Sequence, residues 1–346
     1  MPSKIKKILI FFLTLSMTFS LPGCNKAEQE KAMEEKSSEE HLEIGMSVDS
    51  FVIERWQRDR DVFVSTANEL GAEVNVQTAN GEVDEQISQI EYFIDKGVDL
   101  IVIVVVDAQS LSGVVAKAKK AGIKVMCYDR VIKNADADLY ISFDNDMVGE
   151  MMAAALCSKA GRGRKIVTIC GPESDYNVNM VASGFDKVAN NFDMKVIGTT
   201  QCEGWKAEYA YDYVSNHADI IKDADAIMCG NDLLAGEAIR ALSEMRLAGK
   251  IPVVGQDADL EACQRIVEGT QLMTVYKPVE KLAKTAAEYA VKLAAGEDIG
   301  ETDLFNDGSY DIPYVKLDPI SVTKKNMDET IIGSGFHLRD EVYLDK

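Results

Sequence analysis

The sequence predicts an α/β protein with two similar lobes, each built around a parallel sheet, and 346 residues are enough for both. From Ile44 onward, short apolar runs alternate with segments of helical periodicity, which indicates successive strand–helix–strand units. Residues 100–106 (LIVIVVV) are continuously apolar, as is typical of a parallel strand covered on both faces. Residues 119–129 and 246–257 share one plan, in which a helix end is followed by Ala-Gly, a short strand and an aspartate. We therefore expect the same arrangement to occur twice.

Each expected element follows from its own stretch of the pattern. In the first lobe, Gly71 and Gly97 close two helical segments, as glycine commonly does just after a helix. The first-lobe strands are expected at 44–48, 73–77, 100–106 and 124–128, and its helices at 54–70, 82–96 and 109–121. The second-lobe strands are expected at 165–170, 194–199, 224–229 and 251–255, and its helices at 179–191, 207–220 and 232–248.

The N-terminus has the features of a secretory signal: three lysines, an apolar run over 8–20, and a short motif that ends at Cys24. The run is too short for a comfortable membrane span of about 20 residues. The motif Leu-Pro-Gly-Cys resembles a bacterial lipobox, which implies a signal peptide over 1–24 and lipidation of Cys24. The alternative is an ordinary cysteine in an uncleaved anchor. Residues 25–41 are almost all polar and are expected to form a charged tether, so either alternative places the folded part outside the cytoplasm, at the bacterial cell membrane.

The chain is strongly acidic, with a formal net charge of −20 at pH 7, and such a surface disfavours nucleic acid as a partner. Its seven cysteines and three histidines show no Cys-x-x-Cys or other metal-ligand spacing, so neither a metal nor a cofactor is expected. We interpret the six cysteines beyond Cys24 as small buried hydrophobic residues, with a disulfide among them as the open alternative.

Polar and aromatic residues follow the predicted strands of both lobes. In open parallel sheets, ligands bind at the carboxyl ends of the strands, so two facing lobes would bring these residues to one cleft, with Asp129 and Asp257 on opposite walls. The residues after the strands are Arg55, Trp56, Asp129, Arg130, Asp175, Tyr176, Asn177, Glu203, Gly204, Trp205, Asn231, Asp232, Gln256, Asp257, Tyr276 and Lys277. Carboxylates, amides and fixed cations beside tryptophan rings suit a small polyhydroxylated ligand, whose hydroxyls both donate and accept hydrogen bonds.

Each of these residues also has a purely structural interpretation. Asp129 and Arg130 could form an ion pair with each other, and Asn231 could act only as a helix N-cap. Trp56 could be a core residue, and Lys277 could be solvated. Their common position after strands favours the site. If they do bind a sugar, Asp129 and Arg130 should lack some of their hydrogen-bond partners without it.

Four stretches of the sequence carry a family resemblance: IGMSVDSFVIERWQRDRDVF, the segment from VQTANGEVDEQ to KVMCYDR, LYISFDNDMVGE, and VGQDADLEACQRIVEGTQLMTVYKP. They resemble the D-xylose-binding branch of the pentose and hexose periplasmic-binding proteins, which are substrate-binding subunits of bacterial ABC sugar importers. The resemblance runs from about residue 44 to 337. It implies that the ligand-binding residues are Arg55, Trp56, Asp129, Arg130, Asn177, Trp205, Asn231, Asp257 and Lys277, and that the ligand is D-xylose or a related monosaccharide. The family's Asp-Asn-Asn segment reads Asp175-Tyr176-Asn177 here, and Tyr176 could alter either the pocket size or a contact behind it.

The family's fold implies two Rossmann-like lobes joined by a three-segment hinge, the type I periplasmic-binding protein fold. The implied lobes are 42–143 plus 278–305 for the N-terminal lobe, and 144–277 plus 306–346 for the C-terminal lobe. Facing carboxylates could suggest a glycosidase, but Asp129 and Asp257 each have donor-rich neighbours, no general acid is evident, and Gly-x-Ser-x-Gly and phosphate-binding loops are absent from the sequence, so we do not expect an enzyme. A repressor with the same core would need a DNA-binding helix-turn-helix where the signal and tether stand. Two partners remain open: the permease subunits of an ABC importer, or the ectodomain of a sensor histidine kinase.

Overall fold

The computed structural model describes residues 41–53 and 55–344. The predicted signal peptide, the lipobox with Cys24 and the tether up to residue 40 lie outside the described residues. Within the described part, no helix is long and apolar enough to cross a membrane.

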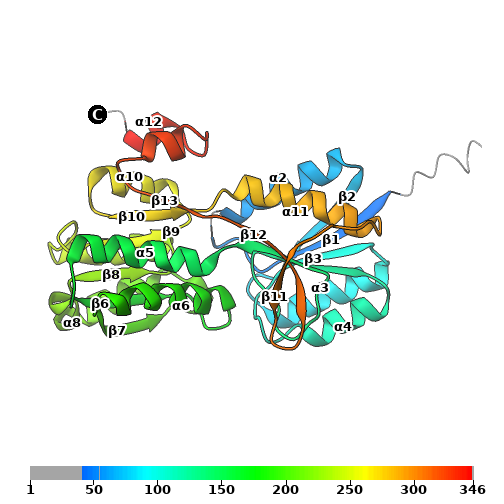
Figure 1. The fold of residues 1–346 in the computed structure, drawn as a ribbon, viewed down its shortest axis with the longest axis horizontal. Helices are drawn as coiled ribbons and strands as arrows, with labels where there is room; N and C mark the ends of the chain where they lie inside the picture. Colours follow the sequence, from blue (N-terminus) through cyan, green and yellow to red (C-terminus); the bar gives the residue numbers. More distant parts are fainter. Residues whose placement is uncertain (1–40, 54, 345–346) are drawn as a thin grey trace, which may run out of the picture. The chain divides into compact units, whose positions relative to one another are not determined.

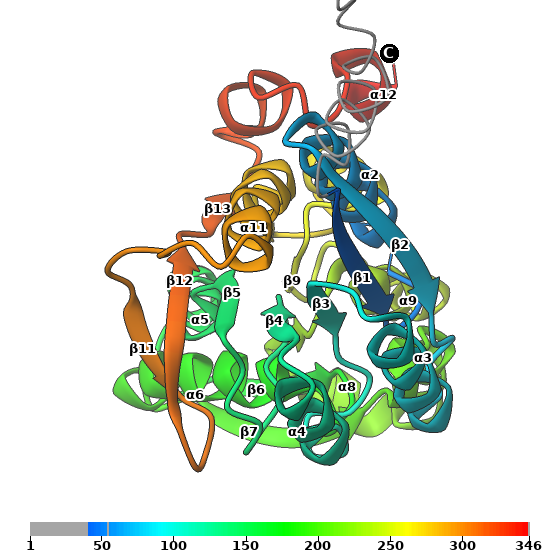
Figure 2. The same cartoon turned by 90° about the vertical axis from the view of Figure 1, so that its right-hand side faces the viewer.

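The first lobe surrounds a seven-stranded sheet in the order β11-β12-β5-β4-β3-β1-β2, seen edge-on to the right in Figure 1 and from that side in Figure 2. All neighbours in it are parallel except β11 and β12. The strands are β1 (Leu42–Val48), β2 (Ala72–Thr78), β3 (Leu100–Val104), β4 (Lys124–Tyr128), β5 (Leu139–Phe143), β11 (Asp303–Asn306) and β12 (Asp311–Leu317). The helices packed with this sheet are α2 (Arg55–Glu69), α3 (Val83–Lys96), α4 (Ser112–Lys120) and α11 (Val279–Ala294).

The second lobe surrounds a six-stranded sheet in the order β13-β10-β9-β8-β6-β7, in which only β13 is antiparallel to its neighbour. Its strands are β6 (Lys165–Cys170), β7 (Lys195–Gln201), β8 (Ala226–Cys229), β9 (Val253–Gln256), β10 (Met273–Tyr276) and β13 (Ile320–Val322). Its helical segments are α5 (Asn145–Ala160), α6 (Tyr176–Asn191), η1 (Glu203–Trp205), α7 (Glu208–Asn216), α8 (Ala218–Asp223), α9 (Asp232–Glu244), α10 (Leu260–Glu268), η2 (Asp328–Ile332) and α12 (Arg339–Tyr343). The predicted class, two α/β lobes with parallel sheets, is confirmed.

The described chain passes between the two sheets three times: after β5, after β10 and after β12. Two of these passages touch, since the Asp144 N–H donates a hydrogen bond of 2.9 Å to the carbonyl of Leu317. The expected boundary between residues 305 and 306 falls inside β11. Because β12 pairs with β5 in the first sheet, the last passage comes after Leu317 instead, and the β11–β12 hairpin belongs to the first lobe.

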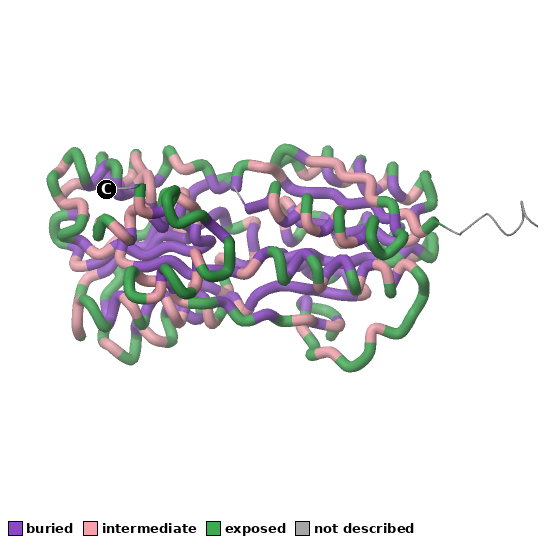
Figure 3. The backbone as a smooth tube through the Cα atoms, turned by 90° about the horizontal axis from the view of Figure 1, so that it is seen from above, coloured by how far each residue is buried: buried purple, intermediate pink, exposed green. Residues whose placement is uncertain are grey.

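Buried residues follow the strands, whereas exposed residues lie on the outer turns of the helices (Figure 3). The run at 100–104 is fully covered, as its apolar pattern predicts for a strand with helices on both faces. Strands of this kind end together at one edge of each sheet, and that edge positions the side chains that follow them. The six described cysteines are free thiols, five of them buried.

Candidate functional site

A cavity lies where the strand ends of the two lobes face each other, and all nine candidate residues line it. The space that the centre of a water-sized sphere can occupy inside it is about 30 Å³, so the lining side chains lie close together. The remaining lining residues are Ile53, Asn145, Cys170, Gly171, Asp175, Val178, Val181, Met228, Gly230 and Gln256. The sequence prediction of one cleft shared by both lobes therefore agrees with the placement of these side chains.

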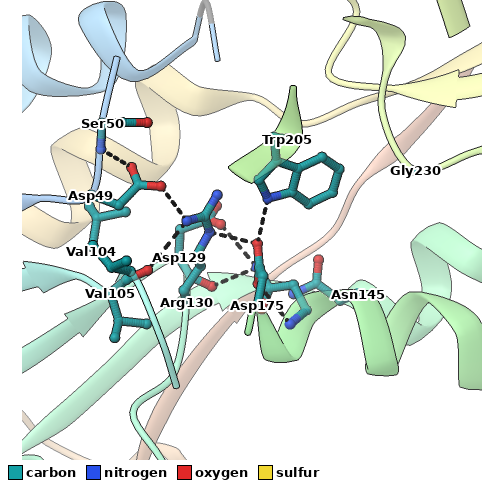
Figure 4. Close-up of polar contacts among 12 residues, drawn as sticks. Asp49, Ser50, Val104, Val105, Asp129, Arg130, Asn145, Asp175, Trp205 and Gly230 are labelled. Carbon is teal, nitrogen blue, oxygen red and sulfur yellow. Dashed lines mark hydrogen bonds and ion pairs between the residues drawn. The ribbon is translucent and has the colours of Figure 1, made fainter. Parts of the chain in front are cut away.

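Arg130, which follows β4, is held between carboxylates of the two lobes (Figure 4). Its Nη1 lies 2.5 Å from Asp49 Oδ2 in its own lobe, and its Nε lies 2.7 Å from Asp175 Oδ2 in the second lobe. The Val105 carbonyl accepts a further hydrogen bond of 3.3 Å from Nη1. Figure 4 shows the guanidinium between these partners, so its plane is fixed by contacts on both sides.

Arg55, at the start of α2, is fixed in a second buried cluster. Its Nη1 lies 2.9 Å from Asp129 Oδ2. Its Nε and Nη2 donate to both oxygens of Asp59 at 3.1 and 3.0 Å, and the Tyr128 hydroxyl donates to the same carboxylate. The guanidinium also lies over the Trp56 ring, 4.5 Å from its centroid. Asp129 and Arg130 therefore bind other residues and not each other.

These contacts decide the charge states of the buried groups. Burial alone would raise the pKa of Asp129, but the cations Arg55, Lys277 and Arg130 outweigh it and hold that pKa below its usual value. Burial would likewise lower the pKa of Arg55, but Asp129 and Asp59 raise it well above the ordinary value. For Asp49 and Asp175, burial prevails over the attraction of Arg130, and the pKa of each carboxyl is raised. Asp129 and Arg55 therefore stay charged at neutral pH.

In the second lobe, Asn231 caps a helix and also lines the cavity. Its Oδ1 accepts a hydrogen bond of 2.9 Å from the Leu234 N–H and so caps α9, while its Nδ2 remains available in the cavity. Lys277 is not solvated, because it is 6% exposed and its Nζ lies 2.8 Å from Asp257 Oδ1. The Gln256 amide nitrogen donates to the carbonyl of Gly230, which leaves its Oε1 as an acceptor.

Trp205 lies against the ends of β6 and β8, where two glycines make room for it. A Cβ on Gly171 would come within 2.3 Å of the indole ring, and one on Gly230 within 3.2 Å. The indole Nε1 donates to Asp175 Oδ2 at 3.2 Å (Figure 4). Any side chain at Gly171 would therefore displace the ring.

Three of the cavity residues have a backbone conformation that L-amino acids rarely adopt. The φ angles are +62° at Asp129, +58° at Trp205 and +98° at Asp257. Each such residue costs on the order of 1–3 kcal/mol unless its surroundings hold it in place, and strain of this kind concentrates at functional sites. Asp129 and Asp257 directly follow strands β4 and β9, and Trp205 is the last residue of the short helical segment η1.

The buried polar atoms without a hydrogen bond are gathered at the cavity. Among the described residues they are Trp56 Nε1, Asn177 Oδ1, Asn231 Nδ2, Gln256 Oε1 and Asp257 Oδ1. All five residues line the cavity, although Asp257 Oδ1 also has its ion pair with Lys277. Since buried polar groups are almost always paired, the other four atoms, which have no partner and lie at one place, favour a polar ligand there.

The expectation that Asp129 lacks some of its partners is wrong, because Arg55 and Asn177 bind its two carboxylate oxygens; Arg130 is held at Nε and Nη1. The unpaired atoms belong mostly to neutral amides and an indole. Sequence reasoning also missed Asp49 and Asp59, which hold the two arginines, and did not include Gln256 in the binding set. Each carried a signal: Asp49 directly follows β1, Asp59 lies one helical turn after Arg55, and Gln256 directly precedes Asp257.

Comparison with known proteins identifies the family. Residues 44–298 match the periplasmic binding protein domain. The chain is 45% identical over 307 residues to a D-xylose-binding periplasmic protein of Haemophilus influenzae, covering 87% of this chain and 92% of that protein. It is 43% identical over 344 residues to a D-xylose-binding periplasmic protein of Escherichia coli, covering 98% and 100%.

A solved structure, an ABC transporter solute binding protein from Clostridium phytofermentans with bound β-D-glucose, has a TM-score of 0.77 at 26% identity. The match covers 87% of this chain and 99% of that one. Proteins of this group bind substrates and are not enzymes, in agreement with the sequence prediction. The chain belongs to the family of periplasmic sugar-binding proteins.

Proposed function

We propose that this protein binds D-xylose, or a closely related monosaccharide, in the interlobe cavity, closes on it, and delivers it to an ABC importer on the outer side of the cytoplasmic membrane. The observation that carries the proposal is the gathering of unpaired buried polar atoms at this cavity. The names of the two D-xylose-binding relatives support the choice of sugar.

The unpaired atoms match the chemistry of sugar hydroxyls. The Trp56 and Asn231 nitrogens are donors, and the Asn177, Gln256 and Asp257 oxygens are acceptors. A hydroxyl group can satisfy one atom of each kind. Hydrogen bonds to charged groups contribute about 1.5–3 kcal/mol each, and the indole rings of Trp56 and Trp205 offer apolar faces to the C–H face of a sugar. A sugar that lacks one hydroxyl would leave a protein atom unpaired and bind much more weakly.

The division of the site between the lobes supports closure. Arg55, Trp56, Asp129 and Arg130 belong to the first lobe, whereas the other five candidate residues belong to the second. A ligand shifts an open–closed equilibrium only as far as it binds the two states differently. A sugar that reaches both walls only in the closed state would supply that difference.

A thermal-shift panel of monosaccharides, followed by calorimetry, tests the binding. We expect D-xylose to raise the melting temperature, and Asp257→Ala or Arg130→Ala to abolish the shift. Arg162→Ala is the matched control, since Arg162 forms an exposed ion pair with Asp193 far from the lining set. If ribose or galactose stabilised the protein far more than xylose, the proposed substrate would be wrong.

The partner and the anchor need separate experiments. We expect the protein to co-purify with ABC permease subunits when xylose is present; co-purification with a sensor kinase ectodomain instead would favour the sensing alternative. Lipid attachment at Cys24 is expected to incorporate labelled fatty acid, and a Cys24→Ala variant should lose the label. A wild-type protein without label would contradict the anchor.

A further inference from the structure

The first turn of α6 and the residues just before it make successive contacts with the first lobe. The Ser174 carbonyl accepts a hydrogen bond of 2.9 Å from the Ala108 N–H. Asp175 forms the ion pair with Arg130, and Asn177 Nδ2 donates to both the carbonyl and Oδ1 of Asp129 at 3.1 Å. We call residues 174–177 the interlobe segment.

Asp175 differs from the other members because its carboxylate also holds a residue of its own lobe. One oxygen, Oδ2, accepts from Trp205 Nε1 at 3.2 Å and contacts Arg130 Nε at 2.7 Å. The other oxygen, Oδ1, accepts from the Asn177 N–H at 3.0 Å and caps α6. Figure 4 shows Asp175 between the indole and the guanidinium. One buried carboxylate thus connects candidate sugar-binding side chains of both lobes.

The two contacts respond differently to opening. Trp205 and Asp175 belong to the same lobe, so their hydrogen bond does not depend on closure. Arg130 belongs to the other lobe, so its contact with Asp175 exists only when the lobes meet. At 2% exposure, Asp175 is almost fully removed from water, and a buried carboxylate is strongly disfavoured unless it is paired. Arg130 therefore offsets part of the cost of burying Asp175 in the closed state.

We propose that Asp175 is a positioning residue that fixes Trp205 from its own lobe and Arg130 from the other, and so couples lobe closure to the assembly of the sugar site. This inference rests on the proposed function. Asp175 acts through the two side chains that it orients. Its loss should therefore shorten the life of the sugar complex more than it slows the encounter between sugar and open protein.

The test compares Asp175→Asn with Asp49→Asn. Both variants remove a buried carboxylate that pairs with Arg130, but Asp49 lies in the same lobe as Arg130 and Asp175 lies across the cleft. Asparagine has a single acceptor oxygen, so Asp175→Asn removes the charge and can keep either the α6 cap or the hydrogen bond from Trp205, but not both. Stopped-flow tryptophan fluorescence would give the rates with D-xylose, and small-angle X-ray scattering would give the compaction at saturating xylose.

We expect xylose to dissociate about tenfold to a hundredfold faster from Asp175→Asn, with the association rate within about threefold of the wild type. The compaction on binding should also be smaller than in the wild type. Asp49→Asn should weaken binding but keep the full compaction. If Asp175→Asn does not fold, Asp175→Ser keeps a helix cap and removes the carboxylate as well.

An unchanged dissociation rate in Asp175→Asn would overturn the inference while leaving the proposed function intact. Equal losses of compaction in both variants would also overturn it, because Asp175 would then have no special role in closure. A wild-type protein that binds none of the monosaccharides would instead remove the proposed function, and this inference with it.

Discussion

The family resemblance implies an asparagine at position 176, where this chain has tyrosine, and the structure predicts what replacing Tyr176 would do. The residue does not line the cavity. Its ring lies 4.2 Å from Lys133 Nζ in the first lobe and packs against that lobe's apolar cluster. Tyr176 therefore does not change the size of the pocket. The second expected effect, a contact behind the pocket, applies instead, and this contact joins the two lobes.

The magnitude of Tyr176→Asn follows from this contact. A cation over an aromatic ring contributes roughly 0.5–1 kcal/mol when exposed and about 2 kcal/mol when desolvated. Lys133 is 9% exposed, so we place the contact near the upper end, at about 1.5 kcal/mol. Every 1.4 kcal/mol corresponds to about a tenfold change in affinity. Since the contact exists only between closed lobes, the dissociation constant of every bound sugar should rise about tenfold.

Calorimetry with a set of monosaccharides would measure this. Tyr176→Phe keeps the ring and should stay within about twofold of the wild type. Lys133→Met should weaken binding similarly, and the double variant should lose little more than either single variant, because both remove one interaction. A change in the order of preference among sugars, or an unaffected Tyr176→Asn, would refute this account of Tyr176.

Three further predictions concern groups around the cavity. Asp59→Asn should lower the free energy of unfolding, measured by urea unfolding, by about 2 kcal/mol and should weaken xylose binding in calorimetry. This loss is smaller than the usual cost of breaking a buried ion pair, because Asp129 still neutralises Arg55. Asp129, whose pKa is lowered by folding, stabilises the protein above about pH 4, and this stability is lost as the pH falls through its lowered pKa. Asp129→Asn should therefore be less stable at pH 7 and lose less stability between pH 5 and 2; parallel pH profiles would contradict this. Burial raises the pKa of Cys170 to about 11, so at pH 7.5 its alkylation, followed by mass spectrometry, should be at least about a hundredfold slower than that of free cysteine. Labelling as fast as free cysteine would contradict the raised pKa and the partial burial of Cys170.

The candidate site could be predicted because its residues occupy a recurrent position in the fold. Parallel strands bring their carboxyl ends to one edge, so residues as distant as Arg55 and Lys277 could be assigned to one cleft before any contact was known. Asn231 shows where this reasoning stops. Its helix-cap role and its proposed ligand role compete as interpretations of the sequence, but Oδ1 caps α9 while Nδ2 is left without a partner at the cavity, so the cap does not rule out the proposed role.

The contacts that hold the arginines in place could not be predicted. They join a helix to a strand that is distant in the sequence, and the hydrophobic periodicity does not show which helix packs on which strand. Asp59 lies one turn after Arg55 on α2, which is a local signal, but its other partner is Tyr128 on β4. The expected lobe boundary at residues 305 and 306 cut the β11–β12 hairpin for a similar reason. The sequence of these strands does not show which sheet they join, and only the pairing of β12 with β5 places them in the first lobe.

The arrangement of charge in the cavity predicts which sugars it accepts. Its three cations, Arg55, Arg130 and Lys277, are each already paired with a carboxylate. The unpaired polar atoms of the lining belong to amide and indole groups, so no unpaired cation in the lining remains for an anionic ligand. A sugar acid would bury its carboxylate beside other carboxylates without compensation. We therefore expect D-xylonate to bind at least about a hundredfold more weakly than D-xylose in calorimetry at pH 7. If the two affinities were comparable, one of the three cations would have to leave its carboxylate and pair with the ligand. The ion pairs described here would then not persist in the ligand-bound protein.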